Sequence, residues 1–405
     1  MENKTEGALL RVLSALLVSG VLLFLAASGL WSLLREGDSV SYYENRQLAS
    51  PPQLSREGVL SGGSFRELDT WLREHTAGRN TILRAGTLFH WKVLRRPVVN
   101  EVVLGEEVLL PWQDFWTYSR EDLRGPAEAM ADRLAEHARC AEEQGGRFLY
   151  VAVPAQAQAF GEAYPAYLQS HLDFYTDAAG LLFEALEARG VAALDMREVF
   201  LEKGILEETA SRVDNHYSIE GAYETYRCLM ERLASDRGEA PEYLREGEFR
   251  IEYLPNHYLG SRSRKLFDLW PGEERLGILI PEEEIPLRRR DTAPWLAKPR
   301  ESDTVYELPE SPEETVSYSL YMGGDWASTV LETGRPGLPR VLLYGDSFTN
   351  PLECILWRDC DVLYSFDFRD YGEKTLDELI RELSPDVVIC VRDYEALLKT
   401  EGNGQ

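Results

Sequence analysis

The sequence predicts an α/β domain built around a mostly parallel β-sheet and preceded by one transmembrane helix. From about residue 126 onward, short and wholly apolar runs alternate with amphipathic stretches. That alternation is typical of buried parallel strands covered by helices on both faces. Near the N-terminus, an uncharged apolar run is long enough to cross a bilayer.

Composition excludes several classes of protein. The chain has 405 residues, which suits one large α/β domain with insertions or two smaller domains. Its 43 basic and 69 acidic residues give a net charge of −26, and such a surface repels phosphate backbones. We therefore expect no nucleic-acid partner. The five cysteines are odd in number and lack metal-type spacing, so we expect neither a disulfide framework nor a metal site.

The apolar run covers residues 12–34 and contains no charge. Its length matches the ~30 Å of a hydrocarbon core, and Trp31 stands where an aromatic belt would lie. A cleaved signal peptide is the alternative, because the small residues at 26–28 resemble a cleavage site. The run continues past that site, which favours an uncleaved anchor. Residues 1–36 are thus predicted to be a cytoplasmic tail and anchor in the cell membrane, with the large remainder extracytoplasmic.

Three further divisions follow along the chain. Residues 37–100 begin as a polar, proline-containing stalk and continue as a helical extension. Residues 101–405 form the main domain. Within it, residues at about 240–335 are rich in Pro, Arg and Glu and interrupt the alternation, so we expect an insertion there.

The alternation itself predicts the elements of the main domain. A hairpin is expected around Gly105, because apolar runs flank it. The pattern then predicts helices at 126–144, 176–189, 219–234, 351–358 and 375–383, and strands at 148–153, 191–194, 341–344, 362–366 and 387–391.

A serine follows one of these strands directly. The apolar run 341–344 leads into Gly345, which permits a tight turn, and Ser347 comes just beyond the strand's carboxyl end. Open α/β sheets place their sites at that edge. A helix is expected to start at Asn350-Pro351, and free backbone N–H groups at its N-terminus can stabilise an oxyanion. The alternative is a serine in an ordinary strand-to-helix turn.

A nucleophilic serine needs a base, and the base needs an anion to orient it. Asp214 and His216 stand two residues apart, just before a helix that Ser218 can cap, so one loop can supply both groups. His257 is the rival base, but it has no nearby aspartate. The other histidines lie in or beside helical segments without a suitable carboxylate: His75, His90, His137 and His171.

Together the two segments resemble a known family. Gly-Asp-Ser-Phe at 345–348 and Asp-x-His at 214–216 are similar to the signature blocks of SGNH-type esterases and acyltransferases. Their order is reversed here, which resembles the permuted SGNH-like domains of the alginate O-acetyltransferases AlgX and AlgJ and of the DHHW proteins. Three more stretches resemble DHHW elements: residues 44–48, 321–325 and 367–371.

The resemblance implies an SGNH-like three-layer α/β/α fold and a function. It implies a membrane-anchored O-acetyltransferase that modifies a cell-surface or secreted polysaccharide. Ser347 would accept the acetyl group, His216 would act as general base and then acid, and Asp214 would orient His216. It implies no freely bound cofactor, because an MBOAT-type membrane acyltransferase would supply the donor. A carbohydrate esterase with the same triad and a non-catalytic envelope assembly protein are the alternatives.

The resemblance also suggests which residues bind the oxyanion or the substrate. Three of them depart from the family pattern: Asp325 replaces an asparagine, Gln156 stands where a lysine is frequent, and Tyr217 replaces a tryptophan. The full set of candidates is Gly324, Asp325, Asp346, Arg369, Tyr217 and Gln156.

Two smaller features are interpreted mainly as ordinary structure. The basic run at 287–290 is interpreted as a solvated face or a partner for an acidic patch rather than a site for an anionic polymer. Aromatic residues are interleaved with polar ones at Trp112, Phe115, Trp116 and Tyr118. They are interpreted as packing residues, with stacking on sugar rings as the alternative.

Overall fold

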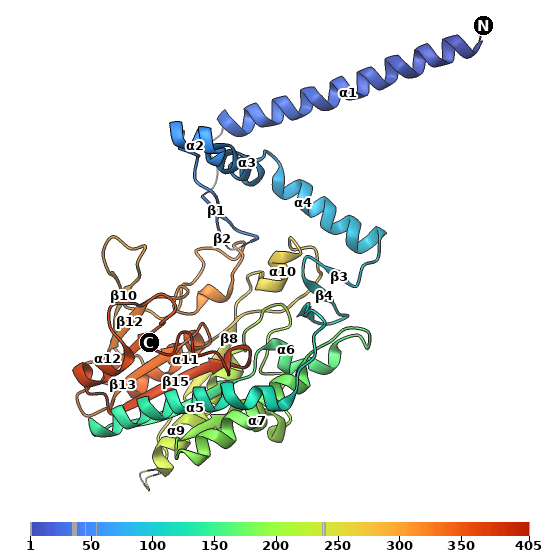
Figure 1. Cartoon of the computed structure of the whole chain (residues 1–405). Coiled ribbons are helices and arrows are strands. Elements are labelled where there is room, and N and C mark those ends of the chain that lie inside the picture. Colours follow the sequence, from blue (N-terminus) through green and yellow to red (C-terminus); the bar gives the residue numbers. More distant parts are fainter. Residues whose placement is uncertain are drawn as a thin grey trace. The chain divides into compact units, whose positions relative to one another are not determined.

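The computed structural model describes residues 2–34, 39–44, 46–53, 55–236, 238 and 240–404 (Figure 1). The chain divides into two compact units. The smaller comprises Met1–Asn100 with Arg264–Leu269, and the larger comprises Glu101–Ser263 with Trp270–Gln405. The predicted boundary between anchor and stalk, at residue 36, falls outside the described residues.

The N-terminal helix α1 (Glu2–Leu34) belongs to the smaller unit. Its segment Val12–Ser32 has a mean hydropathy of 2.2 and is long enough to cross a membrane. Apolar side chains along it are exposed, for example Leu17 at 69% and Leu23 at 70%. Exposed leucines along a helix suit a lipid environment better than water. A signal sequence meets the same description.

We expect the full-length chain to stay in the membrane fraction after washing with high salt. Salt releases proteins held by charge but not a helix that buries about 20 apolar residues in lipid. The measurement is fractionation of cells followed by mass determination of the purified protein. A soluble product whose N-terminus lies just after Ser28 would contradict an uncleaved anchor and indicate a signal peptide.

The rest of the smaller unit is mostly helical. Two ion pairs fasten its segments, Arg46 to Glu74 and Arg79 to Glu44, each at 2.7 Å. Asn45, part of the stretch that resembles a DHHW element, lies outside the described residues. The elements are β1 (Val40–Ser41), β2 (Arg46–Gln47), α2 (Arg56–Ser61), α3 (Gly63–His75), α4 (Arg79–Leu88), the π-helix η1 (Phe89–Val93) and β3 (Val98–Val99).

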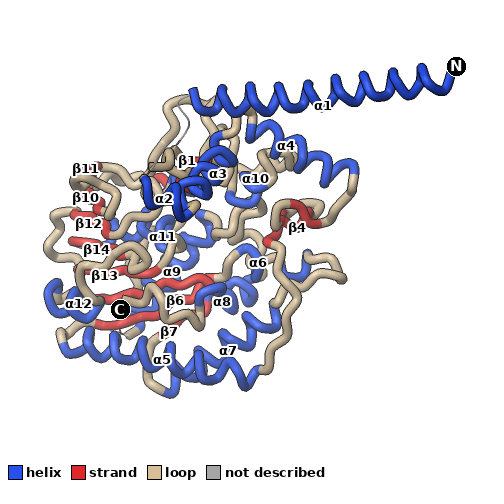
Figure 2. The backbone as a smooth tube through the Cα atoms, turned by 45° about the horizontal axis from the view of Figure 1, so that its top comes forward, coloured by secondary structure: helices blue, strands red, loops and turns tan. Residues whose placement is uncertain are grey.

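One large sheet organises the larger unit (Figures 1 and 2). Neighbours from β14 to β7 pair in parallel, and those from β11 to β14 pair antiparallel. The strands lie in the order β11 (Arg300–Ser302), β10 (Arg288–Thr292), β12 (Ser328–Glu332), β14 (Val362–Phe366), β13 (Arg340–Gly345), β15 (Val387–Asp393), β6 (Arg147–Val153) and β7 (Ala193–Asp195).

Helices cover both faces of this sheet. Leu342 and Tyr344 of β13 point into a core with α5 (Arg120–Glu143), α7 (Leu172–Ala188) and α12 (Leu376–Leu383). In Figure 2, α5 and α7 run along one side of the strands. Val341 and Leu343 point the other way and are also buried, on the side of α11 (Thr349–Leu356), which contacts β13 and packs against α9 (Ile219–Ser235). The helix α8 (Met196–Lys203) contacts β6. Burial on both faces explains why the strands are wholly apolar, and it confirms the predicted α/β class.

Residues 240–335, where an insertion is expected, contribute to the large sheet. They supply β10, β11 and β12, which extend the sheet beyond β14. These strands carry charged residues and pair antiparallel, so they lack the apolar pattern that revealed the others. The same region holds a separate hairpin of β8 (Phe249–Tyr253) and β9 (Gly277–Pro281), the helix α10 (Ser261–Lys265) and the 3-10 turn η3 (Tyr318–Leu320).

Short elements complete the larger unit. The predicted hairpin around Gly105 is present as β4 and β5. The remaining short elements are β4 (Val102–Leu104), β5 (Leu109–Pro111), α6 (Gln156–Ala159), η2 (Gly161–Ala163), η4 (Trp357–Asp359) and η5 (Tyr394–Ala396).

Glu353 makes the stability of this unit depend on pH. It lies buried on α11, and Ser365 Oγ donates to its carboxyl at 2.7 Å. Burial raises the pKa of Glu353 to about 7, against the opposing hydrogen bonds from Thr349 and Ser365. An unfolded glutamate titrates at about 4.3, so between that pH and 7 the unfolded state loses a proton that the folded state keeps. Folding is therefore penalised increasingly as the pH rises through this interval.

We expect Glu353→Gln to remove the penalty. The melting temperature of the variant, relative to wild type, should rise from pH 5 to pH 7 and stay level above it, because the amide does not titrate. Melting curves followed by circular dichroism at several pH values provide the measurement. Glu128→Gln, on the exposed side of α5, is the control and should give a constant difference. A constant difference for Glu353→Gln would contradict the prediction.

Candidate active site

The candidate nucleophile stands on a tight turn at the carboxyl end of β13. The strand ends at Gly345, and α11 begins at Thr349, slightly earlier than predicted. A Cβ atom on Gly345 would lie 2.1 Å from the carbonyl oxygen of Val391 on β15, so only glycine allows this approach. The side chain of Asp346 closes the turn by accepting the N–H of Phe348 at 3.0 Å. Ser347 is thereby presented at the edge of the sheet, partly exposed.

The structure brings the three predicted triad residues together. His216 Nδ1 lies 2.5 Å from Asp214 Oδ1, and His216 Nε2 lies 2.7 Å from Ser347 Oγ. Since a carboxylate only accepts, Nδ1–H donates to Asp214 and Nε2 is left to accept the hydroxyl proton of Ser347. An unbroken chain of hydrogen bonds thus links the carboxylate of Asp214 to the hydroxyl of Ser347, and its last bond joins His216 to a residue 131 positions away in the sequence.

Asp214 is held as an anion. It is 1% exposed, and its oxygens accept N–H groups from His216 at 3.2 Å and from Ser261 at 2.5 Å. Burial alone would raise its pKa, but the charge and hydrogen bonds of His216 and the N–H of Ser261 outweigh it and hold the pKa of Asp214 well below its usual range. Gly260 precedes Ser261 in the chain. A Cβ atom on Gly260 would lie 2.3 Å from the carbonyl oxygen of Val213, so glycine is required for Ser261 to approach Asp214.

Glu274 holds the loop that carries Asp214 through hydrogen bonds. One oxygen of Glu274 accepts the N–H groups of Arg212 at 2.8 Å and Val213 at 3.1 Å, and the hydroxyl of Ser211 at 3.1 Å. Ser211 Oγ in turn accepts the N–H of Asp214 at 3.0 Å. These contacts fix the backbone on the approach to the candidate base.

Two tyrosines fix the imidazole and the nucleophile turn. The ring of Tyr318 stacks on His216 with centroids 3.6 Å apart and planes 4° apart, and its hydroxyl donates to the carbonyl of Ser347 at 2.9 Å. Tyr217 is buried, stacks on Phe348 at 5.4 Å and donates to the Phe348 carbonyl at 2.7 Å. Tyr217 therefore positions the turn and has its hydroxyl engaged inside the protein.

Ser261 and Tyr318 are not among the site residues predicted from the sequence. Both come from the stretch 240–335 and reach the triad from α10 and η3, short elements without a periodic pattern. Their contacts are a backbone N–H and a ring face, which residue type alone does not reveal. Their neighbours in the chain gave no signal that could have found them.

Backbone and amide N–H groups beside Ser347 are the candidate oxyanion donors. The N–H of Ser347 has no acceptor among the described residues. Gly324, with φ +109°, instead gives its N–H to the carbonyl of Tyr321 at 3.2 Å. Asp325 accepts from Asn350 Nδ2 at 2.9 Å and from Arg369 at 3.1 Å. Asp325 thus acts as an acceptor that orients the Asn350 amide, whose second hydrogen has no acceptor in the described part of the chain.

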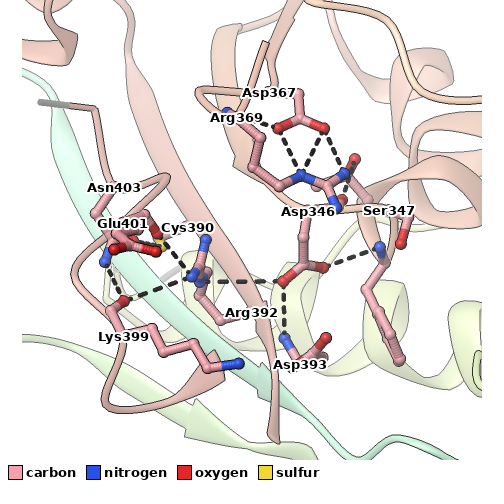
Figure 3. Close-up of polar contacts among 12 residues, drawn as sticks. Asp346, Ser347, Asp367, Arg369, Cys390, Arg392, Asp393, Lys399, Glu401 and Asn403 are labelled. Atoms are coloured by element: carbon pink, nitrogen blue, oxygen red, sulfur yellow. Dashed lines mark hydrogen bonds and ion pairs between the residues drawn. The ribbon is translucent and has the colours of Figure 1, made fainter. Parts of the chain in front are cut away.

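Arg369 sits within a frame of carboxylates (Figure 3). Its Nε lies 2.9 and 3.0 Å from the two oxygens of Asp367, and its terminal nitrogen pairs with Asp325 at 3.1 Å. The side chain remains 44% exposed. Its charge is therefore largely balanced by the protein, while part of the guanidinium faces solvent near the nucleophile turn.

Asp346 connects the nucleophile turn to the C-terminal segment (Figure 3). Its second oxygen accepts the N–H of Asp393 at 3.2 Å and lies 4.0 Å from Arg392 Nε. Arg392 donates to the carbonyls of Glu401 at 3.0 Å and Lys399 at 3.5 Å. Burial, together with the charge of Asp346, raises the pKa of Asp393 above its usual range. The raised pKa favours the neutral form of Asp393, which lessens the repulsion between its carboxyl group and that of Asp346.

Gln156 lies at the start of α6, fully buried beside the His216 loop. Its backbone N–H donates to the carbonyl of Asn215 at 3.1 Å, and its Oε1 accepts from Arg262 at 3.4 Å. Its Nε2 has no partner within the described residues. Of the predicted binding residues, Gln156 therefore has a spare buried donor, whereas Asp346 and Tyr217 have their polar side-chain atoms engaged within the protein.

A second histidine–carboxylate pair lies elsewhere, contrary to the sequence analysis. His137 Nδ1 lies 2.8 Å from Asp377 Oδ1, and His137 Nε2 lies 2.9 Å from the carbonyl oxygen of Asn403. The sequence prediction failed because Asp377 comes from α12, 240 positions away. Both ring nitrogens contact protein acceptors, so neither nitrogen is available to take a proton from a nucleophile. Across the described residues, no group of three or more His, Cys, Asp or Glu could hold a metal ion.

Comparison with known proteins supports the family resemblance. Residues 109–293 match the model of the SGNH hydrolase-like domain of acetyltransferase AlgX. The match includes Asp214 and His216 and ends before Ser347. No curated protein matches this chain.

Two solved structures share the fold of this chain. Bacillus cereus PatB1 with a sulfonyl adduct has a TM-score of 0.63 at 17% identity, covering 75% of this chain and 98% of that one. A DHHW family protein from Eubacterium siraeum has a TM-score of 0.54 at 16% identity, covering 76% of this chain and 95% of that one. The predicted resemblance to the SGNH-like AlgX and DHHW proteins is confirmed.

Proposed function

We propose that this chain is an extracytoplasmic O-acetyltransferase that modifies a cell-surface or secreted polysaccharide through an acyl-enzyme on Ser347. The observation that carries the proposal is the hydrogen-bond chain from Asp214 through His216 to Ser347, at 2.5 and 2.7 Å. That arrangement is the one by which a histidine activates a serine hydroxyl for attack on a carbonyl. The match to an acetyltransferase domain supports acyl transfer as the class of reaction.

In the first half-reaction, Ser347 Oγ attacks the carbonyl of the acetyl donor while His216 Nε2 takes the hydroxyl proton. The oxyanion is stabilised by the N–H of Ser347 and the amide of Asn350. Asp214, already ionised, stabilises the imidazolium without taking its proton. His216 then protonates the leaving group, and the acetyl ester of Ser347 is formed.

The second half-reaction reverses the proton flow. An acceptor sugar hydroxyl attacks the acetyl carbonyl, and His216 Nε2 takes the hydroxyl proton. Collapse of the tetrahedral intermediate releases the acetylated sugar, and Ser347 Oγ regains its proton from His216. The stacked Tyr318 ring holds the imidazole in one orientation through both halves, since their planes differ by 4°.

The acetyl donor is proposed to come from an MBOAT-type membrane acyltransferase, with no freely bound cofactor. Support comes from the apolar helix α1, whose segment Val12–Ser32 would keep the larger unit beside a partner in the membrane. A transferase supplied from within the membrane gains more from such a tether than an esterase does.

The test separates transfer from hydrolysis. Full-length protein in detergent is given a small activated acetyl ester, with and without candidate oligosaccharides, and products are followed by mass spectrometry. Acetylated oligosaccharide supports the proposal. If free acetate is the sole product and pre-acetylated glycan is stripped efficiently, the chain is a carbohydrate esterase. If Ser347→Ala reacts as fast as wild type, Ser347 is not the nucleophile, and the alternative of a non-catalytic envelope assembly protein is favoured.

A further inference from the structure

A cavity distinct from the triad opens beyond the carboxyl end of β6. Its volume is about 510 Å³, within the range of small-molecule sites. One part of its lining is aromatic, with Trp116, Tyr118 and Phe174, and another part is polar, with Glu162, Gln169 and Asp173. The triad makes no use of this cavity.

The aromatic wall of the cavity is rigidly built. His171 stacks on Trp116 with centroids 4.0 Å apart and planes 14° apart, and Phe174 meets the same indole edge-on at 4.7 Å. His171 has φ +50°, a left-handed conformation that costs free energy for any residue but glycine. It is held there because Nε2–H donates to the carbonyl of Asp114 at 2.7 Å. Backbone strain is thus retained at the residue that supports Trp116.

The cavity lies on the same edge of the sheet as Ser347. Two of its lining residues, Gly161 and Glu162, belong to η2, which follows α6 at the carboxyl end of β6. β6 neighbours β15, which neighbours β13, so it stands two strand spacings, ~10 Å, from the strand of the nucleophile. The hydroxyl of Tyr164 donates to the carbonyl of Pro111 at 2.8 Å and fastens the Trp116 segment to this edge.

We infer that the cavity is an acceptor subsite that binds an uncharged sugar residue of the polysaccharide, an inference that rests on the proposed function. A fixed indole ring offers an apolar face to the C–H groups of a sugar ring. Carboxylate and amide groups of Glu162, Asp173 and Gln169 accept hydrogen bonds from sugar hydroxyls.

Charge selects against acidic sugars. None of the described residues that line the cavity is Lys or Arg, whereas Glu162 and Asp173 are acidic and exposed. A uronate or phosphate group would meet like charge without a compensating cation. The net charge of −26 strengthens the exclusion of polyanions at longer range. The subsite therefore selects neutral glycans.

The experiment measures binding without chemistry. Full-length Ser347→Ala protein in detergent is titrated with tetramers of β-linked glucose, β-linked N-acetylglucosamine or galacturonate, and heat is recorded by calorimetry. We expect binding of at least one neutral tetramer and none of galacturonate. Adding Trp116→Ala should weaken neutral binding about tenfold or more. Adding Trp295→Ala, which removes a 59% exposed tryptophan outside the cavity, should leave binding unchanged.

A second variant keeps the inference testable if Trp116→Ala does not fold. Glu162→Lys, at an exposed position, should let galacturonate bind. The inference is overturned if no neutral tetramer binds, if galacturonate binds the unmodified cavity as well as they do, or if folded Trp116→Ala binds undiminished. Because the titration needs no reaction, neutral binding without acetyl transfer would count against the proposed function and not against the subsite.

Discussion

Ser347→Ala and His216→Ala are each expected to lower kcat/KM for a small acetyl ester by about 10⁴ to 10⁶, with Asp214→Ala costing somewhat less. Removing the hydroxyl removes the nucleophile, and removing the imidazole leaves the proton of Ser347 Oγ without the acceptor now 2.7 Å away. Combining the substitutions should add little, because the residues act as one unit. Steady-state kinetics on the full-length variants, with melting temperatures in parallel, provide the measurement.

His137→Gln is the matched control for this experiment. It removes a histidine that also contacts an aspartate, at 2.8 Å, but lies outside the candidate site. It should lower the melting temperature and leave kcat/KM within about twofold, since a buried hydrogen-bonded pair is lost without any reacting group. Activity in Ser347→Ala close to that of wild type, or equal losses in His137→Gln and His216→Ala, would refute the triad.

Arg289→Met is expected to destabilise the larger unit by about 3–5 kcal/mol, the cost of leaving a buried charge unpaired. Arg289 is 1% exposed and donates to Asp291 at 2.8 Å and to the carbonyls of Thr304 and Met322. Without Arg289, the buried carboxylate of Asp291 keeps one hydrogen bond, from Thr329 at 2.9 Å. Arg300 is then its nearest cation, at 3.9 Å. Urea unfolding followed by circular dichroism measures the change.

Two further variants serve as controls for the stability measurement on Arg289→Met. Arg290→Met removes the neighbouring arginine, which is exposed and 3.7 Å from Glu301, and should change stability by less than about 1 kcal/mol. Combining Arg289→Met with Asp291→Leu should recover much of the lost stability, because an apolar pair of similar volume needs no partner. Equal destabilisation by Arg289→Met and Arg290→Met would contradict the assigned burial.

The parallel strands could be predicted because they are buried on both faces and hence wholly apolar. β14 was predicted at 362–366 and occupies Val362–Phe366, and β13 and β15 differ by at most two residues at either end. The antiparallel strands β10, β11 and β12 of the large sheet escaped prediction. In β10, for example, Arg289 and Asp291 are buried as a pair while Arg288 and Arg290 are exposed, so the strand has no apolar pattern. The basic run was interpreted as a solvated face or a partner for acidic groups, and Arg289 is not solvated but is buried against the acidic Asp291.

The three central residues of the candidate site could be identified because their chemistry depends on residue type. Asp214 and His216 share one loop, and Ser347 follows a recognisable strand. The supporting contacts could not be identified in this way. Ser261 contributes only its backbone N–H, and Tyr318 contributes a ring face, 3.6 Å from the imidazole. Such contacts depend on where the chain folds back on itself.

Trapping of the acyl-enzyme tests the central claim most directly. Full-length protein is mixed with an activated acetyl ester, quenched in acid after a short interval and digested, and the peptides are read by mass spectrometry. The account predicts one acetyl group on Ser347 in wild type, none on this peptide in Ser347→Ala, and much slower labelling in His216→Ala. Acetyl groups found on another residue, or labelling of Ser347 at the same rate without His216, would contradict it.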